Sequence, residues 1–377
     1  MGSDLELINV SIADVEYDVS IARNLKKDIV SFLSDKTKNR NVLIVTDQYF
    51  EDKYANELSS QLEITGFKVK LHVMAGGKVS KSFNEVLKIY GVMEVHDFAR
   101  DATLIALGGG VIGDLAGFVA STWYRGMNLV YIPTSLMSMV DSSIGGKVAV
   151  NFRNTINAVG NYYHPIANFM DMDLLDSLSE RDYFSGLAEV IKCALIADVD
   201  FLNYLKSNCD AILARNEEKL VYCVRRAIEI KVDHVSNDVK EGGKRLLLNY
   251  GHTLGHAIEM ATQRDKGEAF RHGEGVALGI SAVLHLSEVH LGFSSEHSNQ
   301  SRDLLQSFGL PTEFSAADHG YDRTDLIGNC MKLMLKDKKR KDNQLRFILL
   351  DKLGQASTYS GIDFEHIRQA FMCVIKD

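Results

Sequence analysis

A glutamate and three histidines in the second half of the chain have residue types and spacings that suit a metal site. Glu189 and Lys192 are three residues apart and so share one face of a helix-like run. His252 and His256 are four residues apart, and His272 follows after an interrupting segment. One carboxylate and two imidazoles are the ligands of an open zinc site, which leaves one position for substrate or water. This set predicts metal-assisted chemistry on an alcohol.

The spacing leaves the ligand set open. His252 and His256 would share a helix face, but such a pair on an apolar helix is also common as a structural feature. Spacing does not decide whether His256 or His272 is the second imidazole ligand. Other histidines, such as His72 and His234, have no partner in the pattern, and we expect no role for them.

A glycine-rich turn, Gly108-Gly-Gly-Val-Ile-Gly113-Asp114, follows the apolar run Thr103–Leu107. Glycines after a strand let the backbone approach a pyrophosphate, which the next helix attracts with its free N–H groups and dipole. The spacing is not G-x-G-x-x-G, so a tight turn without a ligand is the alternative. Strands and helices alternate upstream of the turn, and this favours dinucleotide binding.

Two further groups of residues suit anions. The loop from Asp141 to Lys147 contains Gly-Gly-Lys after a strand, where the ligands of parallel sheets bind. Arg245 and Asn249 closely precede His252. The planar guanidinium of an arginine suits a carboxylate or phosphate, which it can bind through two hydrogen bonds. The alternative for the segment from Lys231 to Arg245, which also contains acidic residues, is a solvated, salt-bridged helix end.

The periodicity divides the chain in two. Residues 42–45, 69–73, 103–107 and 129–132 read as strands, separated by the helical patterns 49–62 and 82–95. We expect 129–132 to be the last strand of this series and 151–173 to be irregular. Helices are then predicted over residues 180–197, 218–237, 249–262, 272–291, 299–308 and 364–375, with a strand at 345–350. We therefore expect domains at residues 1–176 and 177–377.

Composition narrows the function further. The chain has 377 residues, of which 46% are hydrophobic and 24% charged, as in a soluble globular protein. The net charge of −8 argues against nucleic acid as a partner. The five cysteines form no C-x-x-C pair, which is typical of reduced thiols in a cytoplasmic protein. No leader-like start or membrane-length apolar run is visible, so we expect no membrane association.

The motifs together resemble those of the sugar phosphate cyclases of the 3-dehydroquinate synthase type. The matching stretches are G-G-G-V-I-G-D, Arg125-Gly, Pro133-Thr-Ser-Leu, D-S-S-I-G-G-K, S-G-L-A-E-V-I-K, E-G-G-K-R-L-L-L-N-Y-G-H-T-L-G-H-A-I-E, H-G-E and Asp337-Lys-Lys followed by Leu-Arg-Phe. The resemblance implies an α/β fold with a Rossmann-like NAD-binding domain, a mostly helical C-terminal domain, and an active site between them. It also implies a homodimer, because Arg125 matches an arginine that reaches the neighbouring subunit's site.

The resemblance further implies roles for individual residues. It assigns the metal, Zn²⁺ or Co²⁺, to Glu189, His252 and His272. It assigns catalytic or substrate contacts to Asp141, Lys147, Asn157, Lys192, Lys231, Arg245, Asn249, His256, Lys338 (or Lys339) and Arg125. It assigns NAD contacts to Asp47, Lys81, Gly109, Gly110, Val111, Ile112, Gly113, Asp114, Thr134, Ser135, Asp141 and Lys147. Three positions depart from the family pattern: Lys78, Ser135 and Ile156.

The implied reaction oxidises a secondary alcohol transiently with NAD⁺, eliminates phosphate, returns the hydride and closes a carbocycle by intramolecular aldol addition. Arg245 and Asn249 favour a carboxylated substrate, 3-deoxy-arabino-heptulosonate 7-phosphate, since a desolvated guanidinium without an anionic partner would be costly. The alternatives are the specialised cyclases, namely amino-dehydroquinate, 2-deoxy-scyllo-inosose and 2-epi-5-epi-valiolone synthases, and a metal-dependent polyol-phosphate dehydrogenase.

Overall fold

A computed structural model describes residues 5–77, 80–153, 155–263, 269–336 and 345–377. The chain forms two compact units, Met1–Leu178 and Ser179–Asp377. The division falls two residues after the boundary that periodicity suggested, at the N-terminus of the first long helix of the second unit. Among the described residues, no helix combines the length and apolar character needed to cross a membrane.

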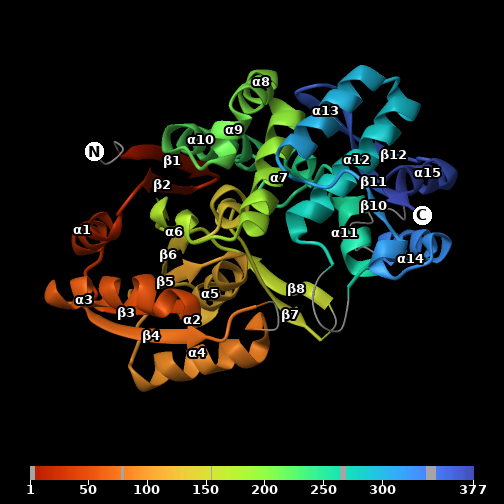
Figure 1. Ribbon diagram of the computed structural model, residues 1–377. Coiled ribbons are helices and arrows are strands. Elements are labelled where there is room, and N and C mark those ends of the chain that lie inside the picture. Colours follow the sequence, from red (N-terminus) through yellow and green to blue (C-terminus); the bar gives the residue numbers. More distant parts are fainter. Residues whose placement is uncertain (1–4, 78–79, 154, 264–268, 337–344) are drawn as a thin grey trace. The chain divides into compact units, whose positions relative to one another are not determined.

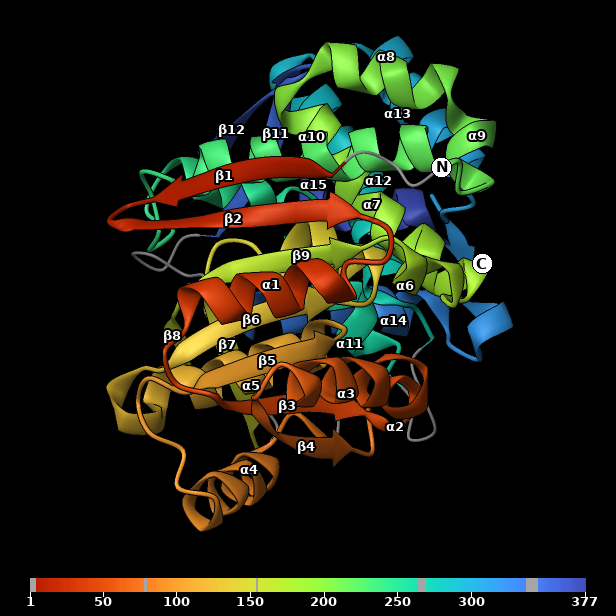
Figure 2. The same ribbon diagram turned by 90° about the vertical axis from the view of Figure 1, so that its left-hand side faces the viewer.

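The first unit is built on a seven-stranded sheet (Figures 1 and 2). Its strands are β1 (Glu6–Ile12), β2 (Val15–Ala22), β3 (Asn41–Asp47), β4 (Lys68–Met74), β5 (Thr103–Gly108), β6 (Asn128–Pro133) and β9 (Ala167–Asp171). They are arranged in the order β1-β2-β9-β6-β5-β3-β4, and every neighbouring pair is parallel except β1 with β2. The order reverses between β3 and β5, which makes that point the topological switch point, where ligands of doubly wound sheets bind.

Helices cover both faces of this sheet because its central strands are apolar on both sides. The helices of the unit are α1 (Lys26–Lys36), α2 (Gln48–Phe50), α3 (Asn56–Ile64), α4 (Phe83–Val95), α5 (Gly110–Thr122) and α6 (Asp173–Asp176). Leu43 and Val45 of β3 pack in one core with α4 and α5, whereas Val42 and Ile44 pack in the other with α1 and α3. Figure 2 looks onto the face that α1 and α3 cover.

Two expectations about the strands of this unit were wrong. The segment 151–173 is not irregular: it contains most of the hairpin β7 (Lys147–Phe152) and β8 (Thr155–Tyr162), and also β9. The strand at 129–132 is therefore not the last of the sheet, because β9 pairs with β6 and β2. Every residue of β8 is exposed and every residue of β9 is buried, so neither shows the alternation that marks a half-buried strand.

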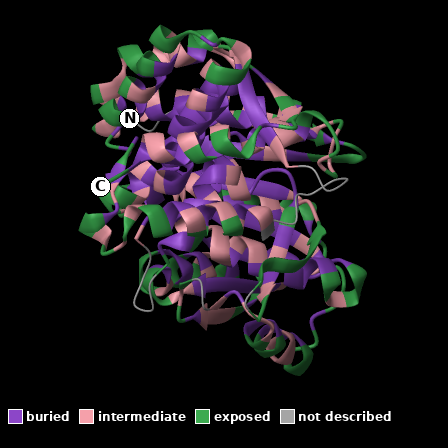
Figure 3. Cartoon of the chain, turned by 90° about the vertical axis from the view of Figure 1, so that its right-hand side faces the viewer, coloured by how far each residue is buried: buried purple, intermediate pink, exposed green. Residues whose placement is uncertain are grey.

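The second unit is mostly helical. Its helices are α7 (Glu180–Ala197), α8 (Val199–Ser207), α9 (Cys209–Leu213), α10 (Glu217–Val235), η5 (Lys244–Asn249), α11 (His252–Ala261), α12 (His272–Leu291), α13 (Ser295–Ser307), α14 (Arg323–Lys336) and α15 (Phe364–Val374). Its strands are β10 (Phe314–Ser315), β11 (Arg346–Lys352), β12 (Gln355–Ser360) and β13 (Ile375–Lys376). Thirteen of the 20 residues of α12 are buried, so this helix lies in the core of the unit. Figure 3 shows buried residues along the inner elements and exposed residues on outer helix faces.

Glycines let α11 and α12 approach backbone to backbone. A Cβ at Gly279 would lie 1.9 Å from the carbonyl oxygen of Gly251, and one at Gly255 would lie 2.4 Å from that of Gly275. Any larger side chain at these positions would push the helices apart. The close contact places the first turns of the two helices together, and both turns carry histidines.

Local backbone geometry explains where two predicted helices differ from the observed ones. The helix expected over 249–262 begins only at His252, as α11, because Gly251 has a φ of +77° that interrupts the coil, and Asn249 is instead the last residue of the 3₁₀ helix η5. The helix expected over 49–62 contains a π-helical turn, Glu51–Ala55, between α2 and α3. By contrast, α7 and α12 have the bounds that periodicity predicted, 180–197 and 272–291.

Candidate metal and substrate site

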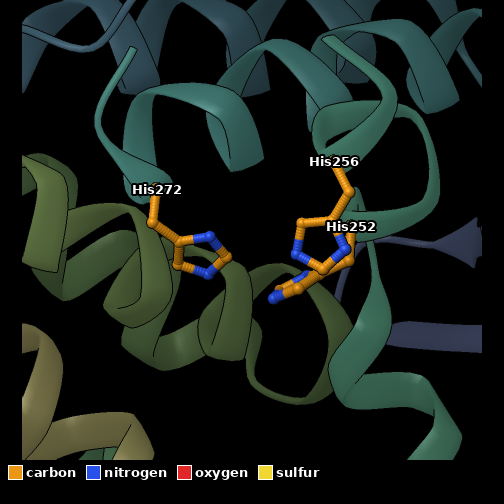
Figure 4. Close-up of side chains that lie close together, drawn as sticks. All are labelled: His252, His256 and His272. Carbon is orange, nitrogen blue, oxygen red and sulfur yellow. The ribbon is translucent and has the colours of Figure 1, made fainter. Parts of the chain in front are cut away.

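Three histidines from α11 and α12 converge at one point of the second unit. One ligand nitrogen from each of His252, His256 and His272 lies within 4.8 Å of the others. Figure 4 shows His252 and His256 on one segment and His272 facing them from another. The ring centroids are 5.2 to 5.5 Å apart. Imidazoles this close, without side chains between them, can share a cation.

Glu189 of α7 completes this cluster. Its Oε1 lies 3.4 Å from Nε2 of His252 and 3.6 Å from Nε2 of His272. The oxygen is buried and makes no hydrogen bond within the described part of the chain. Tetrahedral ligands at 2.0–2.2 Å from Zn²⁺ are about 3.4 Å from one another. Both distances from Oε1 of Glu189 therefore match the spacing of ligands around one zinc-sized cation.

Hydrogen bonds orient both imidazoles that face Glu189. Nδ1 of His252 lies 3.1 Å from the carbonyl oxygen of Tyr250, and Nδ1 of His272 lies 3.2 Å from Oε1 of Glu259. A carbonyl oxygen and a carboxylate only accept, so each Nδ1 carries the proton. When each ring is neutral, Nε2 is the nitrogen without a proton, and it is the one directed at Glu189, as a metal ligand requires.

Lys192 keeps the Glu189 carboxylate ionised. Both side chains are almost fully buried, and Lys192 Nζ donates a hydrogen bond to Oε2 of Glu189. Burial by itself would raise the pKa of Glu189, but Lys192 and His272 outweigh it and lower the pKa to about 2. Burial would lower the pKa of His272, whereas Glu189 and Glu259 raise it to about 10. In the metal-free protein, a proton on His272 therefore supplies the positive charge that a bound cation would otherwise supply.

The start of α12 is fixed to α7, and this positions His272. The N–H of Gly273 donates to Oγ of Ser185 at 2.9 Å, and a Cβ on Gly273 would lie 1.8 Å from the Ser185 carbonyl oxygen. Arg181 donates two hydrogen bonds to the carboxylate of Glu274, at 2.6 and 2.7 Å. Glu274 also accepts from the N–H of Arg271 at 2.7 Å and so caps α12.

The basic residues proposed for a substrate anion lie on neighbouring elements of the same unit. Lys231 of α10 and Arg245 of η5 are 6% and 3% exposed, whereas Lys244 is exposed and pairs with Asp233. The alternative of a solvated, salt-bridged helix end therefore describes part of this segment but not these two residues. The element η5 packs against α7 and α10 and runs into α11 through Gly251. Buried cations this close to a metal cluster are typical of a site for an anionic substrate.

Acidic residues hold this segment in place. Asp238 accepts hydrogen bonds from the backbone N–H groups of Gly242, Gly243 and Arg245 at 2.7, 2.7 and 3.0 Å. The guanidinium of Arg245 donates to the Val239 carbonyl oxygen at 2.8 Å. The turn after Asp238 therefore fixes both the backbone and part of the side chain of Arg245.

Asn249 is also held in place. Its amide donates to Oε1 of Glu241 at 2.7 Å and to the Leu246 carbonyl oxygen at 3.2 Å. Glu241 itself adopts a left-handed backbone conformation, with a φ of +62°, which is uncommon for a residue other than glycine. Residues held in such conformations gather at functional sites.

In the first unit, the predicted nucleotide residues gather at the switch point of the sheet. Asp47 ends β3, and Gly108, at the adjacent end of β5, leads into Gly109 and Gly110 at the start of α5. Asp47 caps α2 by accepting from the N–H groups of Tyr49 and Phe50. A Cβ at Gly110 would lie 3.1 Å from Oγ of Ser142. This turn leaves little room for any side chain, which suits a ligand that approaches the backbone.

Lys81 links three of the predicted residues of this unit. It is 8% exposed, and its ammonium donates to the carboxylate of Asp114 and to the side-chain oxygen of Asn157. The remaining residues of the glycine-rich turn, Val111, Ile112 and Gly113, lie in the first turn and a half of α5. Thr134 donates its N–H to the Gly108 carbonyl oxygen at 3.1 Å, so the turns after β5 and β6 are tied together.

The other predicted residues are placed as follows. Asp141 lies in the π-helical turn Ser138–Ser142, and Lys147 is exposed at the start of β7. Ser135 precedes that turn and shares a hydrogen bond with Ser138 at 2.9 Å. Arg125 is exposed and has a φ of +65°. Lys338, its neighbour Lys339 and Lys78 lie outside the described residues.

Sequence reasoning missed the residues that support the site. Glu259 stands seven residues after His252 and so on the same helix face, a signal that was available but went unused. Asp238 and Arg181 gave no signal, because their partners depend on packing. His72 and His234, which have no partner in the sequence pattern, each have a hydrogen-bond partner in the fold. Nε2 of His72 lies 2.8 Å from Oε1 of Glu85, and Nδ1 of His234 lies 2.7 Å from the Ile230 carbonyl oxygen.

Comparisons with known proteins point to one family. The family descriptions 3-dehydroquinate synthase N-terminal and 3-dehydroquinate synthase C-terminal match residues 71–185 and 186–340. A 3-dehydroquinate synthase of Idiomarina loihiensis is 39% identical over 356 residues, which cover 94% of this chain and 96% of that protein.

Solved structures share the fold. A 2-epi-5-epi-valiolone synthase of Streptomyces hygroscopicus, with NAD⁺ and Zn²⁺ bound, has a TM-score of 0.84 at 24% identity and covers 97% of this chain and 98% of its own. A 2-deoxy-scyllo-inosose synthase complexed with carbaglucose-6-phosphate, NAD⁺ and Co²⁺ has a TM-score of 0.81 at 22% identity, with 97% and 99% covered. A probable glycerol dehydrogenase of Sinorhizobium meliloti scores 0.60 at 16% identity, with 93% and 94% covered.

Proposed function

The chain belongs to the 3-dehydroquinate synthase family, and we propose that it converts 3-deoxy-arabino-heptulosonate 7-phosphate to 3-dehydroquinate and inorganic phosphate. It is then a carbon–oxygen lyase of the shikimate pathway, which leads to aromatic amino acids. The observation that carries the choice of substrate is the burial of Lys231 and Arg245 beside the element that leads into the histidine cluster. Buried basic side chains on elements next to a possible metal site are typical of a site for an anionic substrate, and this substrate carries a carboxylate.

Glu189, His252 and His272 would hold the divalent cation, Zn²⁺ or Co²⁺. The fit rests on Oε1 of Glu189, a buried acceptor that faces two Nε2 atoms at 3.4 and 3.6 Å. When bound, the cation would polarise a substrate oxygen, and NAD⁺ would reversibly oxidise the substrate alcohol. Lys192 would hold the carboxylate ionised, and His256, whose ring lies beside those of His252 and His272, would hydrogen-bond the substrate.

The chain's own side chains divide the remaining tasks between two anionic groups of the substrate. Lys231, Arg245 and Asn249 would bind the carboxylate, and burial strengthens their interaction with it. Lys147, Asn157 and a lysine at 338 or 339 would bind the phosphate, whose own oxygen would serve as the base in its elimination. Lys81, which donates to Asp114 and to the side-chain oxygen of Asn157, would hold that amide in position.

The first unit would bind NAD⁺ at the switch point of its sheet. The support is the convergence of Asp47 and the glycine-rich turn at adjacent strand ends, together with the N-terminus of α5, which attracts a pyrophosphate. The proposed contacts are Asp47, Lys81, Gly109, Gly110, Val111, Ile112, Gly113, Asp114, Thr134, Ser135, Asp141 and Lys147. Arg125 would complete the site of a second copy of the chain, which would make the enzyme a homodimer.

We also propose a cytoplasmic location, because all five cysteines are free thiols in the fold. The specialised cyclases remain the second candidate, since solved enzymes that make 2-deoxy-scyllo-inosose and 2-epi-5-epi-valiolone have TM-scores of 0.81 and 0.84. An amino-dehydroquinate synthase would need the same carboxylate contacts. A polyol-phosphate dehydrogenase is disfavoured, since the glycerol dehydrogenase fold scores only 0.60.

The test is to incubate the pure protein with NAD⁺, Zn²⁺ and candidate substrates while following both inorganic phosphate and NADH absorbance. The proposal expects phosphate release from the heptulosonate phosphate with no net NADH. Phosphate release from neutral hexose or heptulose phosphates alone would select a specialised cyclase, and net NADH formation would select a dehydrogenase. Chelation should abolish phosphate release, and Zn²⁺ or Co²⁺ should restore it.

A further inference from the structure

His272 is the most exposed member of the proposed ligand set. Its side chain is 31% exposed, against 10% for His252 and 1% for Glu189. Its ring lies beside the imidazoles of His252 and His256. Ring contacts do not determine which nitrogen carries the proton, whereas the hydrogen bond at Nδ1 does.

That bond comes from Glu259, which projects from the same face of α11 as His252. Oε1 of Glu259 lies 3.2 Å from Nδ1 of His272, and the carboxylate is 16% exposed. Residues seven positions apart lie two helical turns along one face, so α11 carries both a ligand and the carboxylate that faces another ligand. The two helices are thus linked through a side chain at the metal cluster as well as through their backbones.

Gly275 provides the space that Glu259 needs. A Cβ at Gly275 would lie 2.5 Å from both Cγ and Oε1 of Glu259, so even alanine would displace the carboxylate. Gly275 lies three residues after His272 on α12, so the two residues are on the same face of the helix. The packing of α12 therefore leaves the Glu259 side chain a path toward the His272 ring.

We propose that Glu259 is a positioning residue that holds His272 as the Nδ1-protonated tautomer and directs its Nε2 at the cation. A carboxylate that accepts from a ligand imidazole fixes the ring and makes the ligating nitrogen more basic. At His252, the Nδ1 contact is with the backbone carbonyl oxygen of Tyr250. Glu259 is thus a side chain that tunes the affinity of this cluster for metal through His272. The inference rests on the proposed metal site.

The test compares Glu259→Ala, Glu259→Gln and Glu288→Gln. Glu288 is the matched control, since it is a half-buried carboxylate on α12 that pairs with Arg302 at 3.5 Å and lies about 24 Å along the helix from His272. Zn²⁺ affinity is measured by competition with a chromophoric chelator, and the visible spectrum of the Co²⁺-loaded protein reports ligand geometry. Unfolding in urea of the metal-free proteins verifies that each variant folds.

Glu259→Ala is expected to weaken Zn²⁺ binding about 10- to 100-fold and to alter the Co²⁺ spectrum. Glu259→Gln, whose amide oxygen still accepts from Nδ1, should retain most of the affinity, and Glu288→Gln all of it. If the alanine variant does not fold, Glu259→Asp, which is one methylene too short to reach Nδ1, takes its place with the same expectation. Zn²⁺ affinity and a Co²⁺ spectrum equal to those of Glu288→Gln would overturn the inference.

A His272→Ala variant separates this inference from the metal site itself. If His272→Ala loses Zn²⁺ while Glu259→Ala keeps it, the metal site stands and the role of Glu259 is wrong. If His272→Ala and Glu189→Ala both bind Zn²⁺ as the unmodified protein does, the proposed ligand set is wrong.

Discussion

Lys192 and Glu189 form an ion pair one helical turn apart on α7, with side chains only 2% and 1% exposed. The pair accounts for one carboxylate oxygen of Glu189 and leaves the other, Oε1, facing His252 and His272. A buried anion is stable only while a cation compensates it. In this site the compensation comes from the Lys192 ammonium and from a second positive charge, which is the proton on His272 in the metal-free protein and the divalent cation when metal is bound.

Lys192→Met should therefore destabilise the metal-free protein more than the metal-loaded one. Removing one partner of a buried pair costs about 3–5 kcal/mol, because the remaining charge is left uncompensated. Bound Zn²⁺ would compensate Glu189 and reduce the loss. Urea unfolding with and without Zn²⁺ measures the difference. Lys219→Met, which breaks the exposed pair with Glu218, is the control, and equal effects of the two variants would contradict the prediction.

Arg245→Ala should lower kcat/KM for the heptulosonate phosphate about a hundredfold or more, since a buried charge-assisted contact to the carboxylate is lost. Lys244→Ala is the matched control, because Lys244 adjoins Arg245 in the chain but has a half-exposed side chain that pairs with Asp233. Steady-state phosphate release measures both. Kinetics of Arg245→Ala that match those of Lys244→Ala would remove the reason for choosing a carboxylated substrate.

Gly273→Ala should move the start of α12 and with it His272. The added Cβ would meet the Ser185 carbonyl oxygen at 1.8 Å, a contact that only backbone displacement relieves. We expect a loss of stability of about 1–3 kcal/mol and weaker Zn²⁺ binding. Gly328→Ala on α14, where nothing lies within 4 Å, should instead stabilise by up to about 1 kcal/mol. Unchanged Zn²⁺ affinity in Gly273→Ala would show that this contact does not position the ligand.

The buried His234 should make the metal-free protein less stable in mild acid. Burial lowers the pKa of His234 below its ordinary value, and the nearby cations of Lys244 and Lys192 act in the same direction. As the pH falls below about 6.5, His234 takes up a proton in the unfolded chain but stays neutral in the folded chain. The free energy of unfolding then decreases by at most about 1.4 kcal/mol per pH unit.

His234→Gln removes this group while leaving a side chain of similar polarity. Urea unfolding of the two proteins between pH 7.5 and about 5 gives the comparison. The difference between their unfolding free energies should change with pH only below about 6.5. A constant difference over the whole range would mean that His234 does not couple folding to protons.

The periodicity of hydrophobic residues correctly predicted the elements in which buried residues recur at a regular spacing. The alternation of apolar strands with helices predicted a parallel sheet, and the 3.6-residue pattern gave α7 and α12 with their observed bounds. It failed for β8 and β9, where every residue is exposed or every residue is buried. It also failed at Gly251, whose left-handed conformation ends one helix and starts another.

By itself, the sequence determined which residue types were available for chemistry: a carboxylate, three imidazoles and a set of basic side chains in recognisable motifs. Sequence spacing relates residues over only one or two helical turns. It therefore could not decide whether His256 or His272 is the second imidazole ligand. Only the tertiary structure brought Glu189 to two Nε2 atoms and Glu259 to one Nδ1, through glycines that let α11 and α12 touch. Such contacts depend on how helices pack, and packing is decided by the whole core rather than by neighbours in the chain.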